Sequence, residues 1–307
     1  MGILLIAAAL YLIYSAFATN FYFGLIVTVA LLIYGYFKWY PALCILHAKK
    51  IYKKNAIGAL KWFKRVEKRM NARQLNIYAY YLMREGQAEK SEEIYQKILN
   101  TPLKPDMRLK IRADYAVLLS KTGRTDEAIA ELEEVTINYT NTITYGSLGY
   151  LYILKDNIRK AKNYNHEAYD YNSEDSVILD NMVQLYIKLG DYNKAKKYAD
   201  ELLDKKPYFA EAYYDSAFVY MKIGDIARAK ELLEDARCCR LTFMSTVKES
   251  DLDAIEKAIE TNATENFEHK LGRFSGEEEI TEEDTVNLPV LEEDETEEYD
   301  YEDDPFI

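Results

Sequence analysis

The pattern of hydrophobic and polar positions begins with a long apolar stretch at the start of the chain. Residues 3–37 contain four polar side chains, which are Ser15, Thr19, Asn20 and Thr28. One helix of this length would measure roughly 52 Å, against a hydrocarbon core of about 30 Å. Asn tolerates turn geometry, and its amide prefers the headgroup layer to lipid. The pattern therefore predicts a transmembrane helical hairpin over residues 1–40, with a very short turn at Thr19–Asn20.

Aromatic residues cluster at both ends of the second arm of this hairpin. The first group is Phe17, Phe21, Tyr22 and Phe23, and the second is Tyr34, Tyr36, Phe37, Trp39 and Tyr40. Such belts are typical of membrane interfaces. The alternative is a cleaved signal peptide followed by one anchor, although Met1–Gly2 lacks the basic n-region of a signal peptide. Whether the chain spans the membrane once or twice stays open at this point.

Farther along the chain, small residues recur with a period near 34. Corresponding positions hold Gly86, Gly123, Asp156, Gly190 and Gly224, with spacings of 37, 33, 34 and 34. In this register five units begin at Ala72, Leu109, Thr142, Ser176 and Ala210. Nine of the ten residues at the eighth and twentieth positions are Gly, Ala or Ser. Because small side chains let two antiparallel helices cross at short distance, the repeat predicts stacked helix pairs.

The last three units resemble the tetratricopeptide repeat family. The third unit reads Tyr145-x-x-Leu148-Gly149-x-x-Tyr152, with Ala161 following, and the next two units repeat its spacing. The first two units depart more, since one holds Arg112 where a large apolar residue is usual and the other carries an insertion around Pro102 to Pro105. The resemblance implies an all-α solenoid of five such repeats over residues 72–242. Basic juxtamembrane helices with a degenerate half-repeat (Ala59, Phe63, Val66) are expected over residues 41–71.

In this family the first helix of every unit lines a concave groove, with positions 2, 5, 9, 12 and 13 pointing inward. The resemblance therefore implies a partner-binding groove that contains Tyr80, Met83, Val117, Tyr150, Ile153, Gln184, Ile187, Tyr214, Phe218 and Met221. Such a trough suits an extended peptide or a partner helix, because aromatics supply contact area at low entropic cost. The alternative is that several of these Tyr side chains pack between repeats. The Lys–Asn clamp of chaperone-tail binders is not found at the corresponding positions.

Charge separates the chain further. Residues 38–76 carry eleven basic side chains and one acid, whereas residues 277–307 carry sixteen acids and no base. Because Lys and Arg stay on the cytoplasmic side, the repeats are expected in the cytoplasm. The candidate membrane-proximal basic residues are Lys49, Lys50, Lys53, Lys54, Lys61, Lys64, Arg65, Lys68 and Arg69. Contact with anionic lipids is the simplest interpretation; docking of the acidic tail is an alternative, and a nucleic-acid partner is not expected.

Two segments follow the last unit. Ser250-Asp251-Leu252-Asp253 has the signature of a helix start, and Leu252, Ile255 and Ile259 then fall on one face. We therefore expect residues 243–261 to form a helix that caps the solenoid. Residues 262–307 lose this periodicity and become acidic, so we expect a disordered tail.

Side chains that could carry chemistry are scattered. His47, His166 and His269 lack a Cys or His neighbour at ligand spacing, and Cys238–Cys239 is not a C-x-x-C pair. The sequence also lacks phosphate-loop, nucleophile-elbow and metalloprotease motifs. We therefore expect no enzyme, metal or cofactor, but a membrane-anchored bacterial scaffold or adaptor for protein–protein interaction. The alternative is a regulatory or quality-control factor that delivers a client protein to a membrane enzyme.

Overall fold

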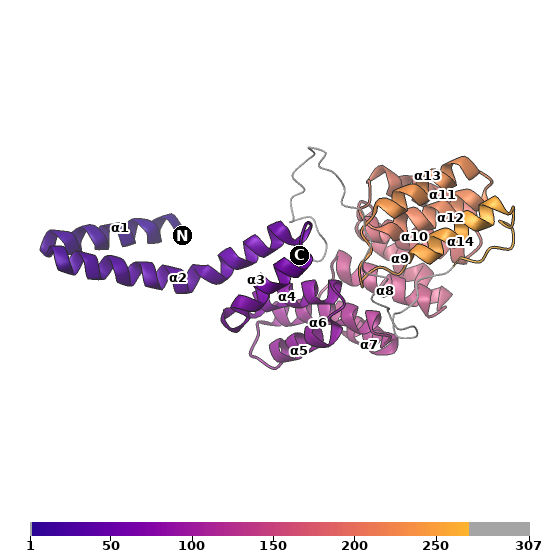
Figure 1. Cartoon of the computed structure of the whole chain (residues 1–307). Helices are drawn as coiled ribbons and strands as arrows, with labels where there is room; N and C mark the ends of the chain where they lie inside the picture. The colour runs from indigo at the N-terminus through magenta and orange to yellow at the C-terminus, as the bar shows by residue number, and fades with distance from the viewer. Residues whose placement is uncertain (1, 270–307) are drawn as a thin grey trace. The chain divides into compact units, whose positions relative to one another are not determined.

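The computed structural model describes the backbone of residues 2–269 and the side chains from residue 7 onward. In this part of the chain every regular element is helical, and the expected all-α class is confirmed (Figure 1). The chain divides into two compact units, Met1–Tyr78 and Ala79–Ile307. They are described separately below. The expected disorder of the acidic tail beyond residue 269 lies outside the described residues.

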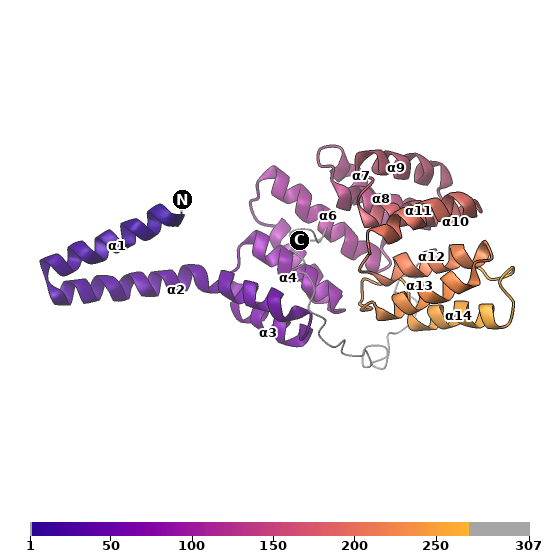
Figure 2. The same cartoon turned by 90° about the horizontal axis from the view of Figure 1, so that it is seen from above.

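In the first unit, α1 (Gly2–Thr19) turns back along α2 (Phe21–Tyr52) (Figures 1 and 2). Asn20 lies alone between the two helices in extended conformation, and its Oδ1 accepts a hydrogen bond from the backbone N–H of Tyr22 at 2.8 Å. This bond satisfies one of the free amides at the start of α2. Gly24 faces Phe17 across the two helices, and a Cβ there would meet the ring at 2.4 Å. The turn therefore forms at the residue where the sequence predicts it.

The hairpin was expected over residues 1–40, and the second helix continues beyond this range to Tyr52. Pro41 removes one backbone donor inside α2 without ending it. The reason is packing: beyond Pro41 the helix buries Cys44, Ile45 and Ala48 and lies against α3 (Ala56–Val66). Within the described residues, α2 is the one helix that is long and apolar enough to cross a membrane, and Ala7–Thr19 of α1 is a shorter apolar segment.

The expected half-repeat is α3, which is followed by a short 3-10 helix, η1 (Glu67–Arg69). Asn55 caps α3 by accepting the backbone N–H of Gly58 at 2.7 Å. The three residues assigned to this half-repeat, Ala59, Phe63 and Val66, are buried. Phe63 stacks on Tyr78, with ring centroids 5.4 Å apart. The packing of the half-repeat is therefore aromatic as well as aliphatic.

The second unit contains the repeats, and its boundary lies within α4. Five helix pairs follow one another: α4 (Ala72–Arg84) with α5 (Ala88–Leu99), α6 (Pro105–Lys121) with α7 (Thr125–Thr136), α8 (Thr142–Leu154) with α9 (Ile158–Tyr171), α10 (Ser176–Lys188) with α11 (Tyr192–Asp204), and α12 (Ala210–Lys222) with α13 (Ile226–Cys238). Four of the five expected unit starts are confirmed. The second pair begins at Pro105 rather than Leu109, because proline at the first helical position needs no N–H partner and has a helical φ.

The small residues bring the two helices of each pair together, as predicted. Ala79, Ala116, Ala128 and Ala229 are fully buried. In the first pair, the hydroxyl of Ser91 donates to the backbone carbonyl of Ala79 at 2.8 Å. The turn within each pair needs a left-handed residue, which is Gly in four pairs and Asp156, with φ of 57°, in the third.

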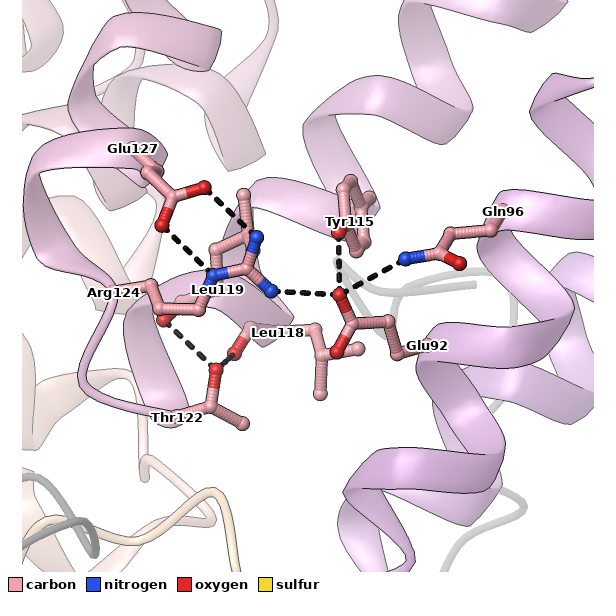
Figure 3. Close-up of polar contacts among 8 residues, drawn as sticks. All are labelled: Glu92, Gln96, Tyr115, Leu118, Leu119, Thr122, Arg124 and Glu127. Carbon is pink, nitrogen blue, oxygen red and sulfur yellow. Dashed lines mark hydrogen bonds and ion pairs between the residues drawn. The ribbon is translucent and has the colours of Figure 1, made fainter.

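Polar networks join neighbouring pairs at the surface. Glu92 on α5 accepts hydrogen bonds from the Tyr115 hydroxyl at 2.7 Å and from Arg124 Nη1 at 2.6 Å (Figure 3). Arg124 in turn holds Glu127 at the start of α7. Within the second pair, Arg112 of α6 binds both Glu131 and Glu134 of α7. An ionic contact therefore replaces the apolar one that the family pattern would place there.

The solenoid ends with α14 (Glu249–Glu260), which packs against α12 and α13. Leu252, Ile255 and Ile259 are buried, as expected of a capping helix. The helix is shorter than the predicted 243–261, because residues 240–248 form an irregular link instead. In this link the guanidinium of Arg240 contacts the Glu85 carboxylate at 2.8 Å, and the amide of Phe243 donates to the carbonyl of Arg84 at 3.2 Å. The link therefore connects the last repeat to the first.

Candidate functional site

One face of α12 carries a stripe of large polar and aromatic residues. Glu211, Tyr214, Asp215, Phe218 and Lys222 are spaced at i, i+3, i+4, i+7 and i+11, which places them on one side of the helix. Asp180 and Gln184 lie on the neighbouring helix α10. These seven residues are called the docking face below. Helix geometry alone aligns the five residues on α12, and packing of α10 against α12 adds the other two.

A later segment of the same chain lies on the docking face. Lys222 Nζ donates to the backbone carbonyls of Thr264 at 2.8 Å and Glu265 at 2.9 Å. The ring of Phe267 lies 6.2 Å from that of Phe218. Residues 264–269, called the docked segment below, therefore do not belong to the disordered tail that the sequence predicted from residue 262. Ordering is possible because aromatic side chains interrupt the polar sequence and find apolar partners.

The docked segment ends at a buried pair of titratable groups. Nε2 of His269 lies 2.6 Å from Oδ1 of Asp215, and the two side chains are only 5% and 4% exposed. The imidazole also contacts the ring of Tyr214, at 5.3 Å, and that of Phe218, at 4.7 Å. Burial lowers the pKa of His269 to about 3 and raises the pKa of Asp215 well above its ordinary value. Burial therefore favours the uncharged form of both side chains.

The docking face has more hydrogen-bond acceptors than donors. Gln184 Nε2 donates to Oδ2 of Asp180 at 2.9 Å. Burial, with the carboxyls of Asp215 and Glu211 nearby, raises the pKa of Asp180 well above its ordinary value. The carboxyl groups of Asp180 and Asp215 also hydrogen-bond to each other, which requires a proton on one of them, while Oε1 of Gln184 has no donor among the described residues. Buried acceptors without donors are costly, so this surface favours an occupant that supplies N–H groups.

The predicted groove residues lie on the first helices of the pairs, and most of them are buried. Tyr214 and Phe218 contact the docked segment directly. Tyr150 is half-buried, with Lys121 Nζ 5.9 Å from its ring. Burial and the carboxyls of Glu211, Asp215 and Asp180 raise the pKa of Tyr150, which places its hydroxyl near the docking face. The remaining seven, all buried, are Tyr80, Met83, Val117, Ile153, Gln184, Ile187 and Met221.

Five residues of this site were not among the predicted groove residues: Asp180, Glu211, Asp215, Lys222 and His269. A signal for three of them was present, because Glu211, Asp180 and Lys222 occupy inward positions 2, 5 and 13 of their units. Asp215 lies one position beyond the inward position 5. His269 belongs to a segment 54 residues downstream of its partner. No local pattern could have joined those two.

The candidate basic residues lie in the first unit. Lys49 and Lys50 end α2, Lys53 and Lys54 follow it, Lys61, Lys64 and Arg65 lie on α3, and Lys68 and Arg69 lie on η1. All are exposed except Lys49, which is half-buried. Arg69 stacks on Phe37 at 4.8 Å, and Arg65 lies 5.9 Å from the ring of Tyr40. The fold therefore sets two cations beside the second aromatic belt.

Groups that could hold a metal ion are not found among the described residues: no three His, Cys, Asp or Glu side chains converge there. Cys44 is buried, while Cys238 and Cys239 are at least partly exposed, and all three are free thiols. The absence of a cofactor and of catalysis remains a prediction from the sequence.

Comparison with known proteins concerns mainly the repeats. Residues 186–237 match the model of the tetratricopeptide repeat family. No curated protein matches the chain. Among solved structures it resembles a tetratricopeptide repeat protein from Parabacteroides merdae, at 19% identity and a TM-score of 0.50, over 73% of this chain and 87% of that one. It also resembles PilW, described as a type IV pilus biogenesis factor, at 14% identity and a TM-score of 0.52, over 64% and 92%. At such identities the likeness concerns the fold.

Proposed function

We propose that this chain, which is a tetratricopeptide repeat protein, is a scaffold or adaptor that holds a partner protein at the cytoplasmic face of a membrane. The repeats supply the interaction surface, and the apolar N-terminal helices supply the anchor. The proposed role is binding of other proteins, without catalysis.

The observation that carries the proposal is the occupied docking face. Aromatic rings, carboxyl groups and one ammonium group on α12 and α10 hold a stretch of polypeptide through both side-chain and backbone contacts. A surface that holds a segment of its own chain in this way has the chemistry to hold a segment of another protein. Rigid aromatic side chains are suited to such contacts because they lose little conformational entropy.

The anchor rests on α2, which is long and apolar enough to cross a membrane, and on the short turn at Asn20 that returns α1 alongside it. The basic residues after residue 38 favour a cytoplasmic position for the repeats. Arg65 and Arg69 lie beside the aromatic residues expected at the interface, where they can meet anionic headgroups. Reporter fusions test this topology: a fusion at residue 100 should be active in the cytoplasm, and an extracytoplasmic signal would contradict it.

Affinity capture with the full chain in nanodiscs tests the binding role. Tyr150→Ala removes a ring from the predicted groove near the docking face, and Ile137→Ala is a matched control because its side chain is 75% exposed at the end of α7. We expect the wild type and the control to capture the same stable set of proteins and Tyr150→Ala to capture less. Equal capture by all three would place the binding surface elsewhere. One captured enzyme whose abundance changes on deletion of the protein would favour the client-delivery alternative.

A further inference from the structure

We infer that the docking face recognises a peptide in which an aromatic residue is followed two positions later by arginine, and that residues 264–269 occupy this site as an internal competitor of that partner. The inference rests on the proposed function, because it names the partner chemistry and the regulation of the same surface.

The aromatic position follows from Phe267. Its ring packs toward Phe218, and Phe267 joins the main hydrophobic core of the repeats. Two residues later, His269 lies against Tyr214 and Phe218. The docking face therefore offers two neighbouring aromatic contacts, and the docked segment fills both with planar side chains.

The docking face also binds the backbone of the docked segment, and this contact does not depend on sequence. Lys222 donates to two consecutive carbonyls, those of Thr264 and Glu265. Any peptide presents such carbonyls, so this contact fixes direction and register but not identity. The side chains three and five positions after Thr264, which are those of Phe267 and His269, then decide specificity.

Arginine at the second position follows from the unmet acceptors. His269 presents Nε2 to Asp215, whereas its Nδ1 has no hydrogen-bond partner among the described residues. Oε1 of Gln184 also has no donor there, and the carboxyl groups of Asp180 and Asp215 hydrogen-bond only through a proton that one of them must hold. A guanidinium carries five N–H groups in a planar fork, pairs with carboxylates and stacks on aromatic rings. It would therefore satisfy acceptors that the imidazole leaves without a donor.

The charged groups around the site also favour a cationic side chain. Carboxyl groups of Asp180, Glu211 and Asp215 lie close enough to influence one another, and Asp251 of α14 acts on His269. The ammonium groups nearby are those of Lys222, which holds backbone carbonyls, and Lys121, which is influenced by Glu211. A cationic side chain complements this balance, whereas an acidic one would be repelled.

Because some hydrogen-bonding groups at the site lack a partner, another peptide can displace the docked segment. A tethered segment competes at an effective concentration of about millimolar, so a free peptide must make better contacts to replace it. Arginine in place of His269 supplies those contacts. Release of the docked segment by substitution should conversely open the site to weaker ligands.

The test uses fluorescein-labelled peptides and the full chain in nanodiscs. One peptide has the sequence of residues 262–269, NATENFEH; the second replaces its His by Arg, and the third replaces it by Glu. Fluorescence polarisation is measured with the wild type, with Phe267→Ala and His269→Ala, which release the docked segment, and with Phe218→Ala, which removes a ring from the docking face. Thermal unfolding of each variant shows whether it is folded.

We expect the Arg peptide to bind the wild type, and to bind the two released variants at least about tenfold more tightly because the internal competitor is gone. The Glu peptide and the Phe218→Ala variant should show no binding. Equal affinity of the Arg peptide for the wild type and both released variants would overturn the internal competition, and failure to bind any folded variant would overturn the partner chemistry.

The capture experiment separates this inference from the proposed function. Capture that depends on Tyr150 but does not increase in Phe267→Ala or His269→Ala leaves the scaffold role intact and contradicts the inference. Capture that is independent of Tyr150, together with tight binding of the Arg peptide to the released variants, contradicts the assigned groove while the peptide site stands.

Discussion

The imidazole of His269 lies 2.6 Å from the carboxyl group of Asp215, with both groups almost fully removed from solvent. The two residues are 54 positions apart in the chain. The contact therefore reports whether the docked segment is in place. Its titration gives the first of four predictions.

Docking of the segment should weaken as the pH falls below about 4, and it should also lose the contribution of Asp215 as the pH rises. His269, whose pKa is lowered to about 3, favours docking above its free pKa and disfavours it as the pH falls. Asp215, whose pKa is raised, favours docking at low pH and disfavours it as the pH rises. Below about pH 4 the docked pair holds one proton fewer than the released pair, and as the pH rises through the raised pKa of Asp215 the docked pair loses the proton that favours docking. Docking weakens in both directions.

Imidazole NMR signals can measure this, since the chain has three His residues and His269→Gln assigns the signal. We expect the docked signal of His269 to keep its neutral form at pH 5 and above, and to lose intensity to a released signal as the pH falls below about 4. Asp180, Asp251 and Lys222 also face the pair, so Asp251→Asn serves as a control that alters the field without removing either partner. A docked population that grows as the pH falls from 5 to 3 would contradict the lowered pKa of His269.

Gly149→Ala should lower the free energy of unfolding by about 1–3 kcal/mol. A Cβ at Gly149 would lie 2.1 Å from Oδ1 of Asn165. The Asn165 side chain is fully buried, and its Nδ2 donates to the carbonyls of Gly149 and Ala161. Asn165→Ala should recover part of the loss in the Gly149→Ala background, with a coupling of about 1 kcal/mol in a denaturant-unfolding double-mutant cycle. The matched change Gly146→Ala, whose Cβ would lie 3.0 Å from Val177, should cost less. Additive effects would mean that the two residues do not share the space.

Asp156→Gly should raise the free energy of unfolding slightly, by about 0.5 kcal/mol. Asp156 has φ of 57°, where a Cβ is unfavourable and where the other four pairs have glycine. The change also removes the ion pair with Lys188 at 3.2 Å, but both side chains are solvent-accessible and such pairs contribute little. Asp156→Ala, which loses the ion pair and keeps the strain, is the control and should be less stable than the wild type. Lower stability of the glycine variant in denaturant unfolding would assign more weight to the ion pair.

Arg65→Gln and Arg69→Gln should each weaken binding of fluorescent phosphatidylglycerol to the full chain in neutral detergent by about fivefold, since one cation near a membrane surface contributes about 1 kcal/mol. Arg159→Gln on α9 changes the net charge equally at an exposed position outside the basic segment. It should leave lipid binding unchanged. The same loss in all three variants would mean that total charge, and not the position beside Phe37 and Tyr40, determines the affinity.

Much of the fold could be predicted because it depends on local spacing. Small residues at fixed intervals specify where two helices touch, so four of the five pairs begin where the repeats placed them. The continuation of α2 to Tyr52 was not predicted, because it depends on packing partners on α3 beyond Pro41. The start of α6 was missed because Pro105 was assigned to an insertion, although proline suits the first position of a helix.

The site was predicted only in part. Tyr214 and Phe218 were expected at the groove from the resemblance, and both meet the docked segment. The carboxyl groups of Asp180 and Asp215 were not expected there, because a charged residue on a helix is usually solvated. Asp215 contacts His269, and residues 264–269 lack any periodic pattern. Such long-range coverage has no signature in the local sequence.

The contact of Arg240 with Glu85 joins residues 155 positions apart. In an open repeat array each unit touches only its neighbours, so the ends can fray and order can spread from any point. Here the link between α13 and α14 ties the last pair to the first, and a loop of that length must close before the tie can form. Fraying of either terminal pair then breaks a contact made by the other, so the two ends of the array lose order together.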